Sequence, residues 1–280
     1  MIEARDPERA RRASELVDMR PVTKVAGLVR ERGDDAVAVE RALEIRVGGR
    51  PLAVTLCTPG HDRELALGFL AGEGLVARRA DVVAARELPA ACADQPDAIE
   101  LTLAPGMAID WAKLERHFAA TAACGLCGRA HLEALRAGLT PMAADVVLPA
   151  EALARLPERL REAQVAFAET GGLHAAAWCD ATLAPQVLRE DVGRHNAVDK
   201  VAGWLLEAGR YPAGLCLMWV SGRAGAEIVL KVARARIPML AAVGAPSTLA
   251  VDLAQASAMT LIGFLRGGRM NVYSGVERIG

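Results

Sequence analysis

The sequence predicts an α/β protein with a smaller α+β domain at its N-terminal side and an α/β domain with a mainly parallel sheet at its C-terminal side. At about 150 residues per domain, a length of 280 residues predicts roughly two domains. Hydrophobic residues make up 52% of the chain, which is enough for a sizeable core. From residue 165 onward, strand-like and helix-like patterns alternate, which is typical of βαβ units.

The N-terminal part begins with a polar segment and continues into β-rich and helical patterns. We expect a polar lead-in over residues 1–20 and an α+β domain over 21–121. Charges of both signs alternate in the lead-in and no apolar segment follows, so no export signal is expected. The expected elements are two strands at 37–47 and 51–57 around Gly48-Gly49, a helix at 64–70 and a strand at 99–103.

A connecting region over residues 122–164 carries a pair of cysteines. Cys124 and Cys127 stand between two helical patterns, at about 110–118 and 131–137. We therefore expect the two thiols on a loop between helices.

The C-terminal domain, residues 165–280, shows the alternation most clearly. One helix, over 196–208, is followed by Gly209, a usual residue after a helix C-terminus. The other expected elements are strands at 165–169, 173–178, 187–190, 215–220, 238–243 and 259–265, and helices at 226–235 and 248–256.

Charge and hydropathy exclude several classes of protein. The 33 basic and 34 acidic residues give a net charge of −1, without the positive excess that follows a nucleic-acid backbone. The charge-free stretches 237–251 and 253–265 are shorter than the ~20 residues of a membrane span. Six cysteines are too few for a disulfide scaffold, and Cys57, Cys92, Cys179 and Cys216 resemble inert core thiols. We expect a soluble, cytoplasmic protein.

Three predicted strand ends run directly into loops of small and polar residues, namely Ser221-Gly222-Arg223, 244–247 and Arg266-Gly267-Gly268-Arg269. In open α/β sheets, ligands bind beyond the carboxyl ends of the strands. Helix N-termini attract anions, and arginines bind phosphates in bidentate fashion. Taken singly, each loop could as well be a tight turn with solvent-exposed arginines as part of a ligand site. The three loops together predict a pocket for an anionic, nucleotide-like ligand.

The C-x-x-C motif of Cys124 and Cys127 carries the sharpest chemical signal. Arg129 and the following helix would favour the thiolate form. A closed zinc site needs four ligands, and only His131 stands close in sequence. A thioredoxin-like redox pair would be expected at a strand-to-helix junction. A sulfur carrier needs one accessible thiolate on a loose loop, and the glycine-flanked motif suits this use best.

Two histidines are candidates for either a structural or a functional role. His174 follows a glycine pair in a predicted strand, and His195 stands in a dense group of charged residues. A buried charge network between two layers explains this group as well as catalysis does, so we assign no catalytic role to His195.

A series of motifs in one order resembles the formate dehydrogenase accessory sulfurtransferases, the FdhD family, from about residue 37 to residue 275. The motifs are Thr58-Pro59-Gly60 with 64–74, Cys124-Gly125-Leu126-Cys127-Gly128, 170–174, 190–200, 221–229, 245–247 and 263–273. The resemblance implies a sulfurtransferase in which Cys124 accepts sulfur from a cysteine desulfurase as a persulfide and Cys127 assists. The sulfur would be delivered to the molybdenum or tungsten of a bis(molybdopterin guanine dinucleotide) cofactor for apo formate dehydrogenase.

The resemblance also implies where the cofactor binds and how the domain folds. The implied binding segment is Phe264-Leu265-Arg266-Gly267-Gly268-Arg269. Ser221 and Arg223 of the strand-end loops and His174 of the 170–174 motif are further residues expected to bind the cofactor. The C-terminal domain would be cytidine deaminase-like and the protein a homodimer. Zinc-dependent deaminases need a H-x-E and a P-C-x-x-C motif, but His174 is followed by two alanines. We therefore predict no intrinsic metal.

Two further hypotheses stay open at this point. The protein could be a chaperone that binds the molybdenum cofactor without a covalent sulfur relay. Alternatively, the dithiol could hold zinc in a small protein-binding module.

Overall fold

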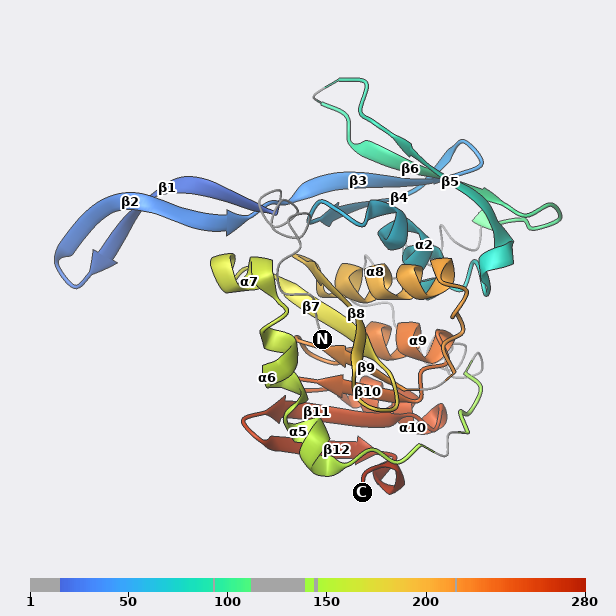
Figure 1. The fold of residues 1–280 in the computed structure, drawn as a ribbon. Helices are drawn as coiled ribbons and strands as arrows, with labels where there is room; N and C mark the ends of the chain where they lie inside the picture. Colours follow the sequence, from blue (N-terminus) through green and yellow to red (C-terminus); the bar gives the residue numbers. More distant parts are fainter. Residues whose placement is uncertain (1–15, 93, 112–138, 144–145, 215) are drawn as a thin grey trace.

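The computed structural model describes residues 16–92, 94–111, 139–143, 146–214 and 216–280. A four-stranded sheet, a layer of helices and a six-stranded sheet lie on top of one another, and a long hairpin projects from one side (Figure 1). Among the described residues, no helix is long and apolar enough to cross a membrane. The cysteines Cys124 and Cys127 and almost all of the expected helices at 110–118 and 131–137 lie outside the described residues.

The projecting hairpin consists of β1 (Val17–Ala26) and β2 (Val29–Ala38), which form a separate antiparallel sheet. Most of its side chains are exposed, and Leu28 at its turn is fully so. Strand β1 begins at Val17, inside the segment expected as a lead-in. The expected strand at 37–47 is divided, because its first two residues belong to the end of β2.

The four-stranded sheet has the order β4-β3-β6-β5 and confirms the expected hairpin at Gly48-Gly49. Both glycines have positive φ angles, 60° and 79°, which L-residues with side chains rarely adopt. Its strands are β3 (Arg41–Val47), β4 (Arg50–Cys57), β5 (Val82–Leu88) and β6 (Asp97–Leu103). The expected helix is α2 (Asp62–Gly72), and a 3-10 turn, η1 (Arg79–Asp81), precedes β5.

The six-stranded sheet has the order β12-β11-β10-β9-β7-β8 and is mixed, so the expectation of a mainly parallel sheet was wrong. Only the β9–β10 and β10–β11 pairs are parallel. The reason is that short turns reverse the chain between β7 and β8 and between β11 and β12. The strands are β7 (His174–Cys179), β8 (Pro185–Asp191), β9 (Leu217–Val220), β10 (Met239–Ala242), β11 (Thr260–Arg266) and β12 (Arg269–Ser274).

The expected helices of the C-terminal part are confirmed as α8 (Arg194–Glu207), α9 (Ala226–Arg234) and α10 (Thr248–Ala256). The expected strand at 165–169 was wrong, because these residues form the helix α7 (Val165–Thr170). The Glu190 carboxylate accepts hydrogen bonds from the Ala166 and Phe167 N–H groups at the start of α7, and Gly171 ends the helix in the left-handed region. Two short helices, α5 (Ala150–Ala154) and α6 (Leu156–Arg161), precede it, and η2 (Val276–Arg278) lies near the C-terminus.

The strands of the six-stranded sheet contribute alternate residues to two hydrophobic clusters. Met218 and Leu240 point into the main core, which they share with α2, α8 and the four-stranded sheet. Their neighbours Leu217 and Met239 point to the opposite face, where Leu153 of α5 packs. This alternation follows from the two-residue period of a strand. The six-stranded sheet is therefore covered on both faces.

Candidate ligand-binding site

A cavity of about 480 Å³ lies where β9, β10 and β11 end. These strands are parallel to one another, so their carboxyl ends meet at one edge of the sheet. Because β7 runs antiparallel to β9, its first residue, His174, reaches the same edge. The cavity is lined there by His174, Ser221 and Arg266, and on the other side by residues of the α6 to α7 segment.

Backbone hydrogen bonds hold the strand-end loops together. The Gly244 N–H donates to the Gly222 carbonyl at 2.9 Å, and the Phe264 N–H donates to the Gly244 carbonyl at 3.1 Å. A Cβ atom on Gly244 would lie 2.9 Å from the Gly222 oxygen, so only glycine permits this approach. These bonds tie the loops at 221–223 and 244–247 to each other and to Phe264 in β11, just before the third loop.

Ser221 and His174 are fixed by their local contacts. The Ser221 Oγ accepts a hydrogen bond from the Ala175 N–H at 2.8 Å, which leaves the hydroxyl hydrogen free to point elsewhere. Partial burial, together with the Arg194 charge, lowers the pKa of His174 below its usual 6.5. At neutral pH His174 therefore carries mostly a neutral imidazole, which can both donate and accept hydrogen bonds.

The segment Phe264-Leu265-Arg266-Gly267-Gly268-Arg269 is divided between core and surface. Leu265 is fully buried in the second hydrophobic cluster, whereas Arg266 and Arg269 are exposed and face each other across the turn. Gly267 and Gly268 form that turn with positive φ angles of 57° and 72°. Of the residues expected to bind cofactor, His174, Ser221 and Arg266 line the cavity, and Arg223, Phe264, Leu265, Gly267, Gly268 and Arg269 do not.

Sequence reasoning missed the opposite wall of the cavity, which α6 and α7 supply. Arg161 covers the Phe167 ring at 4.0 Å from its centroid, and both line the cavity. Gln164, between the two helices, is 2% exposed. This wall was missed because residues up to 164 were assigned to the connecting region and residues 165–169 were expected to form a strand. From the strand side, the lining residue Trp219 presents an Nε1 that has no hydrogen-bond partner within the described residues.

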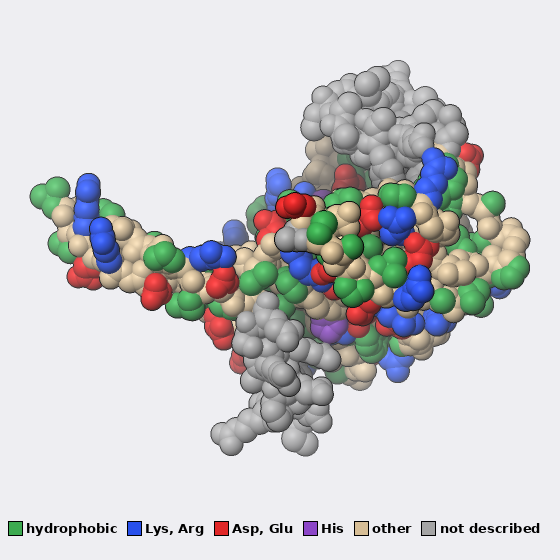
Figure 2. All heavy atoms as spheres, turned by 90° about the horizontal axis from the view of Figure 1, so that it is seen from above, with side chains coloured by type: hydrophobic (Ala, Val, Ile, Leu, Met, Phe, Trp, Pro, Cys, Tyr) green, Lys and Arg blue, Asp and Glu red, His purple; other side chains and the backbone are tan. Residues whose placement is uncertain are grey.

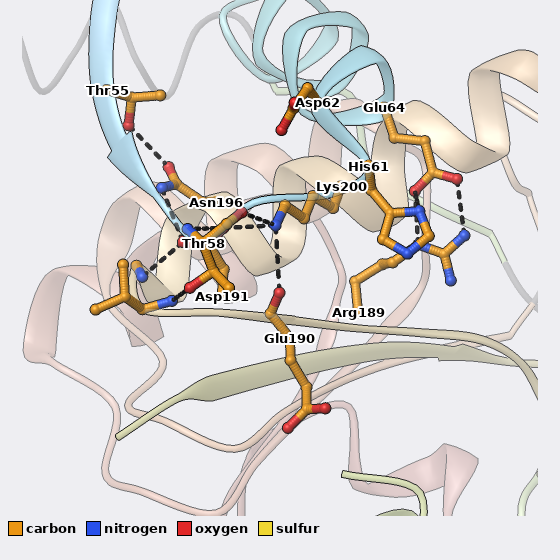
Figure 3. A network of polar contacts seen from close by, with 12 residues as sticks. Thr55, Thr58, His61, Asp62, Glu64, Arg189, Glu190, Asp191, Asn196 and Lys200 are labelled. Atoms are coloured by element: carbon orange, nitrogen blue, oxygen red, sulfur yellow. Dashed lines mark hydrogen bonds and ion pairs between the residues drawn. The ribbon is translucent and has the colours of Figure 1, made fainter. Parts of the chain in front are cut away.

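The charged group around His195 lies mainly in a separate network, which joins the two sheets (Figure 3). Asp191 is fully buried and pairs with the buried Lys200 at 2.7 Å. The Lys200 Nζ also donates to the Thr58 carbonyl at 2.9 Å, and the Thr58 N–H donates to Asp191. Asn196 donates to both the Leu56 carbonyl and Asp191. The network links the end of β4 to β8 and α8, which favours the structural reading of these charges.

Two further polar pairs lie close to this network. Glu64 on α2 receives two hydrogen bonds from Arg189 on β8, at 2.6 and 2.7 Å (Figure 3). Burial alone would raise the pKa of Glu64, but hydrogen bonds and charges from Arg189 and His61 lower it to about 2. The His195 Nε2 lies 3.3 Å from the Glu227 carboxylate, and burial lowers the pKa of His195.

Three of the four described cysteines are buried and poorly suited to sulfur chemistry. Cys57, Cys179 and Cys216 are buried, and burial raises the thiol pKa to about 12, 12 and 11, respectively. Cys92 is exposed, so its expected place in the core was wrong. Cys92 lies in the loop between β5 and β6 and not on a strand of the sheet, so no strand packing buries it. Within the described ranges, no group of three or more His, Cys, Asp or Glu side chains could hold a metal ion.

The surface around the four-stranded sheet carries charges of both signs. Figure 2 shows basic and acidic side chains interspersed with apolar ones over this face. No single-sign stripe is visible there, in keeping with the net charge of −1.

Comparisons with known proteins agree on one family. The sequence model of the FdhD/NarQ family matches residues 38–280. A relative from Mycobacterium tuberculosis, named sulfur carrier protein FdhD, is 47% identical over 253 residues, covering 88% of this chain and 92% of the relative. Relatives of the same name from Streptomyces coelicolor and Anaeromyxobacter dehalogenans are 45% and 44% identical, and cover 94% and 98% of this chain and 96% and 97% of their own lengths.

A solved structure shows the same fold. The crystal structure of a protein from Desulfotalea psychrophila, assigned as a formate dehydrogenase accessory protein, superimposes with a TM-score of 0.74 at 25% identity. The match covers 95% of this chain and 100% of that one.

Proposed function

This chain belongs to the FdhD/NarQ family, and from that membership we propose that it is a sulfur carrier acting in the maturation of formate dehydrogenase. The relatives' name and the assignment of the crystal structure support this role. The observation that carries the binding half of the proposal is the cavity at the strand ends, where His174, Ser221 and Arg266 from three separate motifs meet.

Cys124 is the residue that we propose as the sulfur carrier. Its thiolate attacks the outer sulfur of a persulfide on a cysteine desulfurase, and the desulfurase thiolate leaves. The product is a persulfide on Cys124, with no net oxidation or reduction. Cys127 assists from three residues away. The buried, high-pKa thiols of Cys57, Cys179 and Cys216 are poor alternatives, because the thiolate is the attacking form.

The acceptor of the sulfur is, in this proposal, the molybdenum or tungsten of a bis(molybdopterin guanine dinucleotide) cofactor bound as a substrate. The cavity suits one nucleotide end of that molecule in three ways. Its volume of about 480 Å³ is typical of small-molecule sites. Arg161 and Arg266 supply positive charge for phosphates. Ser221 and neutral His174 add hydrogen bonds. Apo formate dehydrogenase then receives the sulfurated cofactor, and the protein works as a homodimer.

Persulfide mapping tests the covalent relay. After incubation with a cysteine desulfurase and cysteine, the peptide containing Cys124 gains the mass of one sulfur, and Cys124→Ala abolishes the gain. Cys92→Ala is the matched control, since Cys92 is exposed but stands outside the motif. If Cys124→Ala still supports active formate dehydrogenase, the relay is wrong.

The same experiment decides the main alternative, a chaperone that holds the molybdenum cofactor without a covalent step. A chaperone of this kind should bind guanine nucleotides in a calorimetric titration, and Arg266→Ala should weaken that binding. Persulfide mapping should then find no persulfide on any cysteine. Turnover of a Cys124 persulfide would exclude it. Metal analysis of the purified protein separately tests the zinc hypothesis, since a structural site would hold close to one zinc per chain.

A further inference from the structure

The β1–β2 hairpin, residues 17–38, is a projecting arm whose tip is entirely apolar. With ten residues in each strand, the arm extends for about 34 Å (Figure 1). The tip, residues 25–29, has the sequence Val-Ala-Gly-Leu-Val, and all of these residues are exposed. Turns in water are normally built from polar residues and glycine. Figure 2 shows the tip far from the body of the molecule. An exposed apolar end of this kind indicates contact with another molecule.

The charges of the arm are divided between its two halves. The outer half, residues 23–32, has three basic residues and one acidic residue, which gives a net charge of +2. The inner half, residues 17–22 and 33–38, has one basic residue and three acidic residues, which gives a net charge of −2. The charged residues are Lys24, Arg30, Glu31 and Arg32 in the outer half and Asp18, Arg20, Asp34 and Asp35 in the inner half. The arm as a whole is neutral, but its two ends carry opposite charge.

The inner half also carries apolar surface. Met19 and Val37 are both exposed there. They stand on neighbouring rungs of the ladder, where Met19 pairs with Ala36 and Val37 pairs with Asp18, so one side chain points to each face. The inner half thus offers apolar surface with negative charge, and the outer half offers apolar surface with positive charge. Each half complements the other, but the two halves of one extended arm cannot meet.

We propose that the arms of two copies of this chain lie side by side in opposite directions, so that the outer half of each arm contacts the inner half of the other. The inference rests on the proposed function, in which the protein works as a homodimer, and deepens it by naming the contact surface. A two-fold axis makes the same favourable contact twice. Parallel arms would instead place like charges together. A membrane of anionic lipids would attract the tip, but it gives no role to the acidic inner half.

The backbone of the arm supports the same arrangement. Each strand of a two-stranded sheet pairs on one side only, and its other side keeps N–H and C=O groups open. Pro21 removes one N–H from β1, whereas β2 contains no proline. The β2 strands of two antiparallel arms can therefore pair and join both hairpins into one four-stranded sheet. A two-stranded hairpin alone is at best marginally stable in water, so this pairing also stabilises the arm.

The inner half of the arm lies next to the cavity at the strand ends. A Cβ atom on Gly172, which lines that cavity, would lie 3.5 Å from the Cβ of Ala38 at the end of β2. Helix α7, on the same side of the cavity, packs against both strands of the hairpin. In the paired arrangement, the apolar tip of one copy therefore comes close to the cavity rim of the other.

Reversing the charge of each half in turn tests the pairing. Arg30→Glu with Arg32→Glu changes the outer half from +2 to −2, and Asp34→Lys with Asp35→Lys changes the inner half from −2 to +2. Each double variant alone then faces a half of like charge. We expect sedimentation of the full chain to show a dimer for wild type and dimerisation weakened at least about tenfold for each variant alone. An equimolar mixture of the two variants should form a heterodimer, because both of its contacts join opposite charges.

The mixture also controls for folding, since an unfolded variant could not be rescued by the other. The matched control is Arg155→Glu with Arg159→Glu. These arginines are exposed, lie outside the arm and do not line the cavity. This variant undergoes the same change of net charge as Arg30→Glu with Arg32→Glu, and it should dimerise like wild type.

Three results would each overturn the pairing of the arms: a monomeric wild type, a dimer formed by either arm variant alone, or a mixture that stays monomeric. Binding of a monomeric wild type to vesicles of phosphatidylglycerol would identify the tip as a membrane contact instead. Persulfide mapping on Cys124 is independent of these results, because the carrier thiol belongs to a single chain. Failure of the arm contact and failure of the sulfur relay are therefore distinguishable.

Discussion

Asp191 shows at the scale of one residue how the two sheets are joined. Its carboxylate is fully buried and has Lys200 at 2.7 Å, while the Gly193 N–H donates to it at 2.8 Å. Each of these donors offsets part of the cost of burying the Asp191 charge. The buried carboxylate is therefore stable only while all of its donors are present. His195, which stands in the same motif, contacts Glu227 instead and takes no part in this set.

Removing one partner should therefore destabilise the fold strongly. We expect Lys200→Met to lower the free energy of unfolding by about 3–5 kcal/mol, because Asp191 is left as an uncompensated buried charge. Urea denaturation of the full chain measures this. Arg20→Met breaks an exposed pair with Asp18 and should cost about 0–1 kcal/mol. Equal, small effects in both variants would contradict a structural role for the network.

Glu64 gives a prediction about pH. Its pKa is lowered from 4.5 to about 2 in the folded protein, so its pairing with Arg189 and His61 stabilises the fold fully above pH 4.5. This stabilisation is lost as the pH falls from about 4.5 towards 2. In Glu64→Gln the titration is absent. We expect the stability difference between wild type and Glu64→Gln to shrink by about 2.5 kcal/mol between pH 6 and pH 2.5.

Urea midpoints at several pH values test this shift in stability. Glu151→Gln is a suitable control because Glu151 is exposed on α5. A difference between wild type and Glu64→Gln that does not depend on pH would show that Arg189 does not hold Glu64 in its charged form.

At the scale of elements, the packing of α2 against α8 positions the four-stranded sheet over the rest of the molecule. Two glycines allow the helices to touch through their backbones. A Cβ atom on Gly68 would lie 1.7 Å from the Asp199 oxygen, and one on Gly203 would lie 1.8 Å from the Glu64 oxygen. Helix α2 therefore packs directly against the backbone of α8.

A single added methyl group should separate these helices. We expect Gly68→Ala to lower the free energy of unfolding by about 3 kcal/mol, since backbone must move to make room. Gly33→Ala in β2 is the matched control, because nothing lies within 4 Å of its added Cβ atom and its φ is not positive. Urea denaturation compares the two. A Gly68→Ala protein as stable as Gly33→Ala would contradict the close contact.

At the scale of the whole molecule, the two sheets share one hydrophobic core. The main cluster contains Leu43 of β3, Leu65 of α2, Val201 of α8 and Leu240 of β10 (Figure 1). A core that crosses the boundary between sequence segments couples their folding, in contrast to a polar interface between domains. The β1–β2 hairpin lies outside this core.

We expect the chain to unfold in one cooperative transition. Far-ultraviolet circular dichroism follows both sheets, and tryptophan fluorescence follows mainly the C-terminal part, where Trp178, Trp204 and Trp219 lie. The two midpoints should coincide in urea. Two separate transitions would show that the sheets fold independently despite their shared core.

Much of this protein could be predicted from its sequence by local patterns. Gly48-Gly49 predicted a hairpin and Gly209 predicted a helix end, because these features depend on neighbouring residues alone. The alternating pattern from residue 165 onward predicted most strands and helices, apart from the strand expected at 165–169. The order of the motifs likewise placed the chain in its family, as the comparisons show. Ser221 and Arg266, which line the cavity, were singled out because ligands bind beyond the carboxyl ends of parallel strands, whereas His174 was singled out by its motif.

Other features depend on residues that are distant in sequence, and only the tertiary structure decided them. Residues 165–170 form a helix because Glu190, from a neighbouring strand, binds its free N–H groups. The antiparallel pairing of β7 with β9 joins strands that lie on either side of α8 in the sequence, and no local pattern records it. The wall of the cavity that α6 and α7 supply exists only because these helices fold against the strand ends. The sequence determines which side chains the protein has, but tertiary packing decides which of them come into contact.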